Sequence, residues 1–190
     1  RSMKLSPDGN IVYCASGARP NSLHAVDLRA PESASSVIDL ALDRFNPAST
    51  VSVEPFADGT RVAFGSDCGA GVVDLRMNRV SITLSQLGDI KLEDWVWCVD
   101  TAGHSTVGFG CGDGQTGLWD TSQNRIIGTP FSHSHFYRYV RFDPSGRSLL
   151  VTDIDAHVHV LDEQVCGALV HDVLIVVLLM EVVSTVHLLT

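Results

Sequence analysis

The chain has 190 residues, of which 45% are hydrophobic and 18% are charged, and its formal net charge is -9. This composition is that of a globular protein and excludes an intrinsically disordered chain. The negative charge argues against a nucleic-acid binder that tracks phosphates, because such proteins need a basic face. Glycine and proline are spread along the first two thirds of the chain, which predicts short strands, tight turns and an all-β fold.

Five cysteines are spread along the chain without a CxxC pair, namely Cys14, Cys68, Cys98, Cys111 and Cys166. An odd number without paired spacing indicates neither a zinc site nor a complete disulfide framework. The pattern is typical of small buried side chains in a reducing compartment. Residues 1–9 have no apolar stretch of the kind that a secretory signal needs. We therefore expect an intracellular protein, cytoplasmic or nuclear.

A dipeptide ending in aspartate closes four successive apolar runs: Val26-Asp27, Val73-Asp74, Trp119-Asp120 and Leu161-Asp162. The aspartates recur at intervals of 47, 46 and 42 residues. A period of about 40–45 residues is the mark of a β-propeller, in which each repeat supplies one four-stranded blade. The repeat predicts about four blades, approximately residues 1–28, 29–75, 76–121 and 122–162, followed by a separate apolar segment, 163–190.

The first unit opens with the tight-turn sequence Ser6-Pro7-Asp8-Gly9. Proline fixes φ and glycine accepts a positive φ, so the chain can reverse here between two antiparallel strands. Pro20 stands where later units carry an aspartate, within the longer insertion 17–22. We therefore expect a remodelled hairpin in this unit.

The second and third units carry the clearest markers. Each has an upstream turn, at 57–59 and 101–103, and Asp67 and Asp113 stand seven residues before the closing aspartates. A short acidic side chain accepts hydrogen bonds from neighbouring amides, so it stabilises the hairpin before the third strand. The glycine-rich stretch 108–114 leads into a strand and not into a helix with lysine, so it indicates strand and hairpin, not a phosphate-binding loop.

The fourth unit repeats the turn, at 143–146, and the hairpin aspartate, Asp155. Alternating strands are expected at 148–152 and 157–161. An aromatic group enters this unit, consisting of Phe131, Phe136, Tyr137 and Tyr139. Alternation indicates that half of these rings are buried. We take Tyr137 as a candidate partner contact, because aromatic side chains anchor interfaces.

The segment 163–190 lacks turn signals beyond Gly167 and contains an eight-residue apolar run, 173–180. This run is too short to span a membrane, which takes about 20 residues, so no membrane span is predicted. The favoured interpretation is a buried strand or helix of an incomplete next blade. The alternative is an interfacial anchor.

Taken together, these markers resemble the WD-repeat family over residues 3–162. The resemblance implies blade-structural roles for Asp67, Asp113, Trp119, Asp120, His133 and Asp155, with a hydrogen bond between His133 and Asp155. It also implies a radial ring of blades, usually seven. Four blades form an incomplete ring, so we expect further blades of a longer parent or another chain to complete it.

Four histidines are candidate metal ligands, because alternate positions on a strand place side chains on one face: His133, His135, His157 and His159. No carboxylate or cysteine stands nearby at ligand spacing, so a structural role is favoured and no metal is predicted. The sequence has no Gly-x-Ser-x-Gly nucleophile elbow. No catalytic residue and no cofactor are therefore predicted.

The sequence thus predicts a non-catalytic scaffold of WD-repeat type that binds other proteins. Arg29 and Arg76 each end the tripeptide Asp-Leu-Arg, which resembles the paired Asp-x-Arg boxes of substrate receptors for cullin-RING ubiquitin ligases. A guanidinium fork can pair with a partner carboxylate. One alternative is that each arginine bridges its own local aspartate. Another is a propeller enzyme, a hydrolase or lyase, with its site in the central channel.

Overall fold

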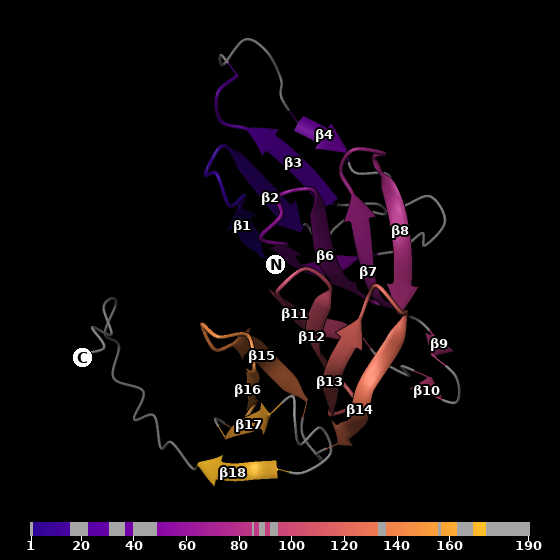
Figure 1. Ribbon diagram of the computed structural model, residues 1–190, viewed down its shortest axis with the longest axis vertical. Helices are drawn as coiled ribbons and strands as arrows, with labels where there is room; N and C mark the ends of the chain where they lie inside the picture. The colour runs from indigo at the N-terminus through magenta and orange to yellow at the C-terminus, as the bar shows by residue number, and fades with distance from the viewer. Residues whose placement is uncertain are drawn as a thin grey trace, which may run out of the picture.

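The computed structural model describes residues 2–15, 23–30, 37–39, 49–84, 86–87, 90–91, 95–132, 136–155, 157–162 and 169–173. Within these residues the regular structure is entirely β: four antiparallel sheets of four strands, and one two-stranded pair (Figure 1). The sheets follow one another in chain order, from the indigo first sheet to the orange and yellow fourth sheet. The prediction of an all-β fold is confirmed.

Strands that are adjacent in sequence are adjacent in every sheet. The first sheet contains β1 (Met3–Leu5), β2 (Ile11–Ala15), β3 (Leu23–Asp27) and β4 (Val37–Asp39). The second contains β5 (Thr50–Pro55), β6 (Arg61–Ser66), β7 (Gly69–Asp74) and β8 (Arg79–Leu84). The third contains β11 (Val96–Ala102), β12 (Thr106–Cys111), β13 (Gln115–Asp120) and β14 (Arg125–Ser132). The fourth contains β15 (Tyr137–Phe142), β16 (Ser148–Asp153), β17 (Val158–Asp162) and β18 (Leu169–Val173). The short pair β9 (Gln86–Leu87) and β10 (Ile90–Lys91) lies between the second and third sheets in sequence.

Each sheet extends one strand beyond the aspartate that closes the sequence unit. The third strands end at Asp27, Asp74, Asp120 and Asp162, and β4, β8, β14 and β18 follow them. The sheets are therefore out of phase with units that end at the aspartates. Leu169–Val173, from the segment set apart at 163–190, pairs with β17 as the outermost strand of the fourth sheet. Residues 174–190 and the insertion 17–22 lie outside the described residues.

The upstream turns of the units join the first two strands of each sheet. In the second sheet, the Gly59 amide donates a hydrogen bond to the Phe56 carbonyl at 3.0 Å, and Gly59 has a φ of 67°. In the fourth sheet, the Gly146 amide donates to the Asp143 carbonyl at 2.9 Å. Because only glycine adopts a positive φ without strain, each turn is fixed locally by its own sequence.

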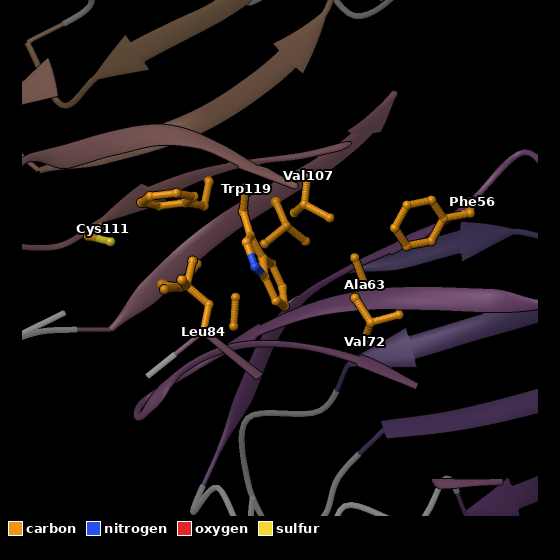
Figure 2. Packing of buried hydrophobic residues seen from close by; sticks show 11 residues of the cluster. Phe56, Ala63, Val72, Leu84, Val107, Cys111 and Trp119 are labelled. Atoms are coloured by element: carbon orange, nitrogen blue, oxygen red, sulfur yellow. The ribbon is translucent and has the colours of Figure 1, made fainter. Parts of the chain in front are cut away.

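Consecutive sheets pack face to face around separate apolar clusters. Between the second and third sheets, Phe56, Ala63 and Val72 lie opposite Val107 and Trp119, all at most 1% exposed (Figure 2). The indole Nε1 of Trp119 donates to the side-chain oxygen of Asn124 at 3.2 Å, so its polar edge is satisfied. Similar clusters join the first sheet to the second and the third to the fourth. The chain thus has one core per sheet interface.

Close approach of the sheets depends on glycine. A Cβ atom built at Gly108 on β12 would lie 2.5 Å from Cδ1 of Leu149, which is fully buried on β16 in the next sheet. A Cβ at Gly65 on β6 would collide with the backbone carbonyl of Val96 on β11. Both glycines stand on the second strand of their sheet and face the following sheet. Without a side chain at these positions, the larger residues of the next sheet can seat directly against the backbone.

The first strands of consecutive sheets are joined by side-chain hydrogen bonds to backbone. The Val99 amide on β11 donates to Oγ of Ser52 on β5 at 3.1 Å, and Thr101 Oγ1 donates to the Pro55 carbonyl at 3.0 Å. On the other side of β11, Asp100 Oδ2 accepts the Phe142 amide of β15 at 2.6 Å. These bonds satisfy backbone groups on strand edges that have no ladder partner in their own sheet.

Replacing Gly108 by valine should lower the free energy of unfolding by about 1–3 kcal/mol, because the added side chain overpacks the seat of Leu149. The measurement is urea denaturation followed by tryptophan fluorescence. Thr106→Val on the same strand is the matched control, because Thr106 is only half-buried and valine is nearly isosteric with threonine. Equal midpoints for the two variants would contradict this account of the interface.

Candidate functional site

A cavity of about 610 Å³ opens along the first strands of all four sheets. β1, β5, β11 and β15 contribute most of its lining. Neighbouring first strands contact each other in the order β1, β5, β11, β15. The cavity is called the first-strand groove below. The hydrogen bonds described above join three of its strands, β5, β11 and β15.

Three of the four first strands carry a β-bulge at the same level of the groove. The extra residue is Val51 on β5, Trp97 on β11 and Arg138 on β15. In each sheet the bulge lies opposite the last two residues of the second strand. A bulge leaves one residue out of the pairing and re-aims its side chain. All three bulge residues line the groove.

Aromatic rings form part of the groove lining. Trp97 stacks on Trp95 with ring centroids 5.2 Å apart and planes inclined by 18°. The ring of Phe136 lies 5.9 Å from that of Trp97 and is tilted by 48°. Trp97 is 41% exposed, although two aromatic neighbours contact it. A large ring that is both fixed and exposed offers a preformed contact surface.

Charged side chains also line the groove. Lys4 Nζ on β1 lies 2.5 Å from Glu54 Oε2 on β5, and Arg141 Nε on β15 lies 4.0 Å from Asp100 Oδ2 on β11. Burial raises the pKa of the Glu54 carboxyl, and the Lys4 ammonium opposes that rise. The Asp100 carboxylate is buried, whereas the Arg141 side chain is 66% exposed. The arginine therefore keeps most of its fork in solvent.

Arg29 and Arg76 bond the aspartates that end the third strands of their own sheets. Arg29 Nη2 donates to Asp27 Oδ2 at 2.8 Å and its Nε to Oδ1 at 3.0 Å. Arg76 Nη2 and Nε make the same two bonds to Asp74, at 2.6 and 3.1 Å. The side chains stay 63% and 68% exposed. The Arg29 hydrogen bond lowers the pKa of Asp27 to about 2, and the Arg76 hydrogen bond lowers that of Asp74.

Tyr137 does not lie at the surface. It is fully buried, and its ring packs edge-on against His159, with centroids 5.9 Å apart. Tyr139 is the exposed ring of the pair, at 70%. The bulge at Arg138 breaks the alternation of β15, so Arg138 and Tyr139 are both exposed. Tyr137 is therefore too buried to make the direct partner contact that the sequence predicted. The exposed residues next to it are Arg138 and Tyr139.

The hairpin aspartates act in different ways. Asp113 accepts the Gln115 amide and side chain, each at 3.0 Å. Asp67 accepts the Ser49 amide, ahead of β5, at 3.3 Å. In the fourth sheet it is Asp153 that accepts two backbone amides, those of Asp155 and His157, each at 2.9 Å. Asp120 accepts the amides of Ser122 and Gln123 after the third strand. His133 lies outside the described residues.

Histidines of the fourth sheet lie beside an acid. His157 Nδ1 is 3.0 Å from Asp153 Oδ2, and His159 Nε2 is 3.6 Å from the same oxygen. Among the described residues, no group of three or more His, Cys, Asp or Glu side chains could hold a metal ion. Burial raises the pKa of the Cys98 thiol to about 12, so it stays a neutral, weakly nucleophilic thiol.

Within the described part of the chain, no helix is long and apolar enough to cross a membrane.

Sequence reasoning singled out Phe136 and Tyr139, which line the groove, but it missed other lining residues, above all Trp97. Strict alternation along the strand predicts regular pairing at Trp97 and Arg138. The bulges that re-aim these side chains depend instead on how each strand pairs with its neighbour. The only local signal was the spacing of Trp95 and Trp97. Two large rings two residues apart point to one face of a strand, where at least one of them needs a partner.

No family model matches the sequence, and no curated protein matches it. Among solved structures, hydrazine synthase of Kuenenia stuttgartiensis is similar, with a TM-score of 0.69 and 18% sequence identity. The similarity covers 90% of this chain and 47% of that chain, so this chain spans about half the length of its structural neighbour. At this identity the likeness concerns the fold alone. Because 1175 chains match the structure, the arrangement by itself points to no single activity.

The Arg29 fork predicts a measurable titration. In the protein Asp27 should titrate at about 2, and Arg29→Ala should move its pKa back toward 3.8. Because the folded pKa is the lower one, the contribution of this pair is present above about pH 4 and is lost as the pH falls toward 2. Carboxyl carbon shifts in NMR measure it. Asp143 is the internal control, because Ser145 and backbone amides hold its pKa at about 2 without an arginine. An Asp27 that titrates near 3.8 in the unchanged protein would mean that the fork is open.

Proposed function

We propose that the chain is a run of four WD-type β-propeller blades that acts as a non-catalytic scaffold for other proteins. The observation that carries the proposal is the repetition of one four-stranded meander, with an aspartate ending each third strand and consecutive first strands in contact. Blades of a propeller share these features. A rigid stack of blades acts by holding partners near each other, requires no cofactor and fits an intracellular setting.

The proposal includes completion of the ring by further blades or by another chain. Leu5 on β1 is 57% exposed, and Leu150 on β16 of the fourth sheet is 38% exposed. These residues lie at the two ends of the sheet series. Apolar exposure at both ends is what an open propeller presents, because only closure of the ring removes such edges.

The ubiquitin-ligase receptor is a narrower form of the proposal. Arg29 and Arg76 use Nε and Nη2 on their own aspartates. An adaptor would therefore have to approach the exposed outer edge of each guanidinium while the aspartate fixes its orientation. Preformed forks lose little side-chain freedom on binding, which favours such a contact.

Replacing both Arg29 and Arg76 by alanine should abolish recovery of a cullin-RING adaptor in a pull-down with the purified chain, because both forks are lost. Arg147→Ala is the control, since Arg147 is an exposed arginine elsewhere, in the turn between β15 and β16. Unchanged recovery with the double variant eliminates the ligase form and leaves the general scaffold proposal in place.

The alternative function is a propeller enzyme with its site in the groove. One observation favours it: Glu54 is a largely buried acid whose pKa is raised by burial. Lys4 already bonds this carboxylate at 2.5 Å, which favours a structural ion pair between the first two sheets. A general acid or base would need to be available to a substrate.

A further inference from the structure

The three bulges place three chemically different side chains at one level of the first-strand groove. Val51, Trp97 and Arg138 come from successive sheets, and each is the residue left out of its own ladder. Each of the three bulges interrupts the regular pairing of its sheet, and the interruptions fall at equivalent positions. Such bulges re-aim side chains next to binding sites in other proteins. The bulges therefore bring Val51, Trp97 and Arg138 into the lining of one cavity.

Trp97 supplies the apolar contact at this level. Trp95 stacks behind it and Phe136 lies beside it, so the ring is fixed before any ligand arrives. The residue is 41% exposed, so part of the indole surface is accessible to an apolar side chain of a ligand. Tryptophan is among the residue types enriched at the binding hot spots of protein interfaces.

Arginines supply the charge. Basic side chains outnumber acidic ones among the lining residues, which include Lys4, Arg138 and Arg141 but only Glu54 as an acid. Glu54 neutralises Lys4. Within the described part of the chain, Arg138 takes part in no ion pair. The Asp100 carboxylate lies 4.0 Å from Arg141 and already accepts the Phe142 amide, and the Glu54 carboxylate, which bonds Lys4, also interacts electrostatically with Arg141. A chain of net charge -9 thus concentrates two available guanidinium groups beside its exposed tryptophan.

We propose that the first-strand groove binds an extended acidic segment of a partner protein, with an apolar side chain of the segment on Trp97 and its carboxylates on Arg138 and Arg141. Guanidinium forks match carboxylates in a bidentate geometry. The inference rests on the proposed scaffold function and names the chemistry of the partner.

A nucleic acid fits the same groove less well. Its affinity for proteins comes from many phosphate contacts, and two arginines release few counterions. The acidic remainder of the chain would repel the flanking phosphates at low salt. A peptide places one or two charges at the arginines and continues into solvent.

The test uses the full chain and two short fluorescein-labelled peptides, one with glutamates flanking a phenylalanine and one with lysines in place of the glutamates. Fluorescence anisotropy should show binding of the acidic peptide and no binding of the basic one. Arg138→Glu should weaken the acidic peptide by at least about tenfold, and so should Trp97→Ala, whereas Trp97→Phe should retain part of the affinity. Arg147→Glu, which changes the net charge equally outside the groove, should leave the affinity within about twofold.

Three results of the peptide experiment overturn the assignment. They are equal affinity for both peptides, equal effects of Arg138→Glu and Arg147→Glu, and no acidic-peptide binding by a chain whose circular dichroism shows native strands. Tighter binding of a labelled single-stranded oligonucleotide, lost with Arg138→Glu, also overturns it. If groove variants change nothing while partner proteins still bind through Arg29 and Arg76, the groove assignment alone fails and the scaffold stands.

Discussion

The structure depends on the contact between the first strands of consecutive sheets. Each first strand is an edge strand of its own sheet, so some of its backbone groups have no ladder partner. Ser52, Thr101 and Asp100 provide partners across the sheet boundary. Because these bonds are made by side chains to backbone, they fix the spacing and the register of one sheet against the next. The groove, with its bulged residues, exists only where that spacing is maintained.

A second constraint acts further out, at the second strands. Gly65 and Gly108 leave room for the following sheet, but Leu150 holds the position on β16 that corresponds to Gly108 on β12. The outward face of the fourth sheet is therefore bulkier than the faces that meet inside the chain. A sheet that packs on that face would need space to accommodate Leu150. It could not insert a leucine of its own there, as the fourth sheet inserts Leu149 against Gly108. This asymmetry distinguishes the end of the series from its interior.

Local features of the fold could be read from the sequence, and long-range ones could not. Turns such as 57–59 and the aspartates that end third strands act within a few residues of themselves, so their spacing was sufficient. The first-strand bulges depend on which residue of another strand lies opposite, which no local pattern encodes. Tyr137 shows the consequence: strict alternation from Tyr137 to Tyr139 puts both rings on one face, and the extra residue Arg138 separates a buried ring from an exposed one.

The contact between first strands can be measured directly by nuclear Overhauser effects in the isotopically labelled chain. The account predicts cross-peaks between Ser52 and Val99, between Pro55 and Thr101, and between Asp100 and the Phe142 amide. They should appear together with the ladder contacts within each sheet. A spectrum that shows intact sheets but lacks these three contacts, or that places β11 against the outer strands β8 or β18, would contradict the account.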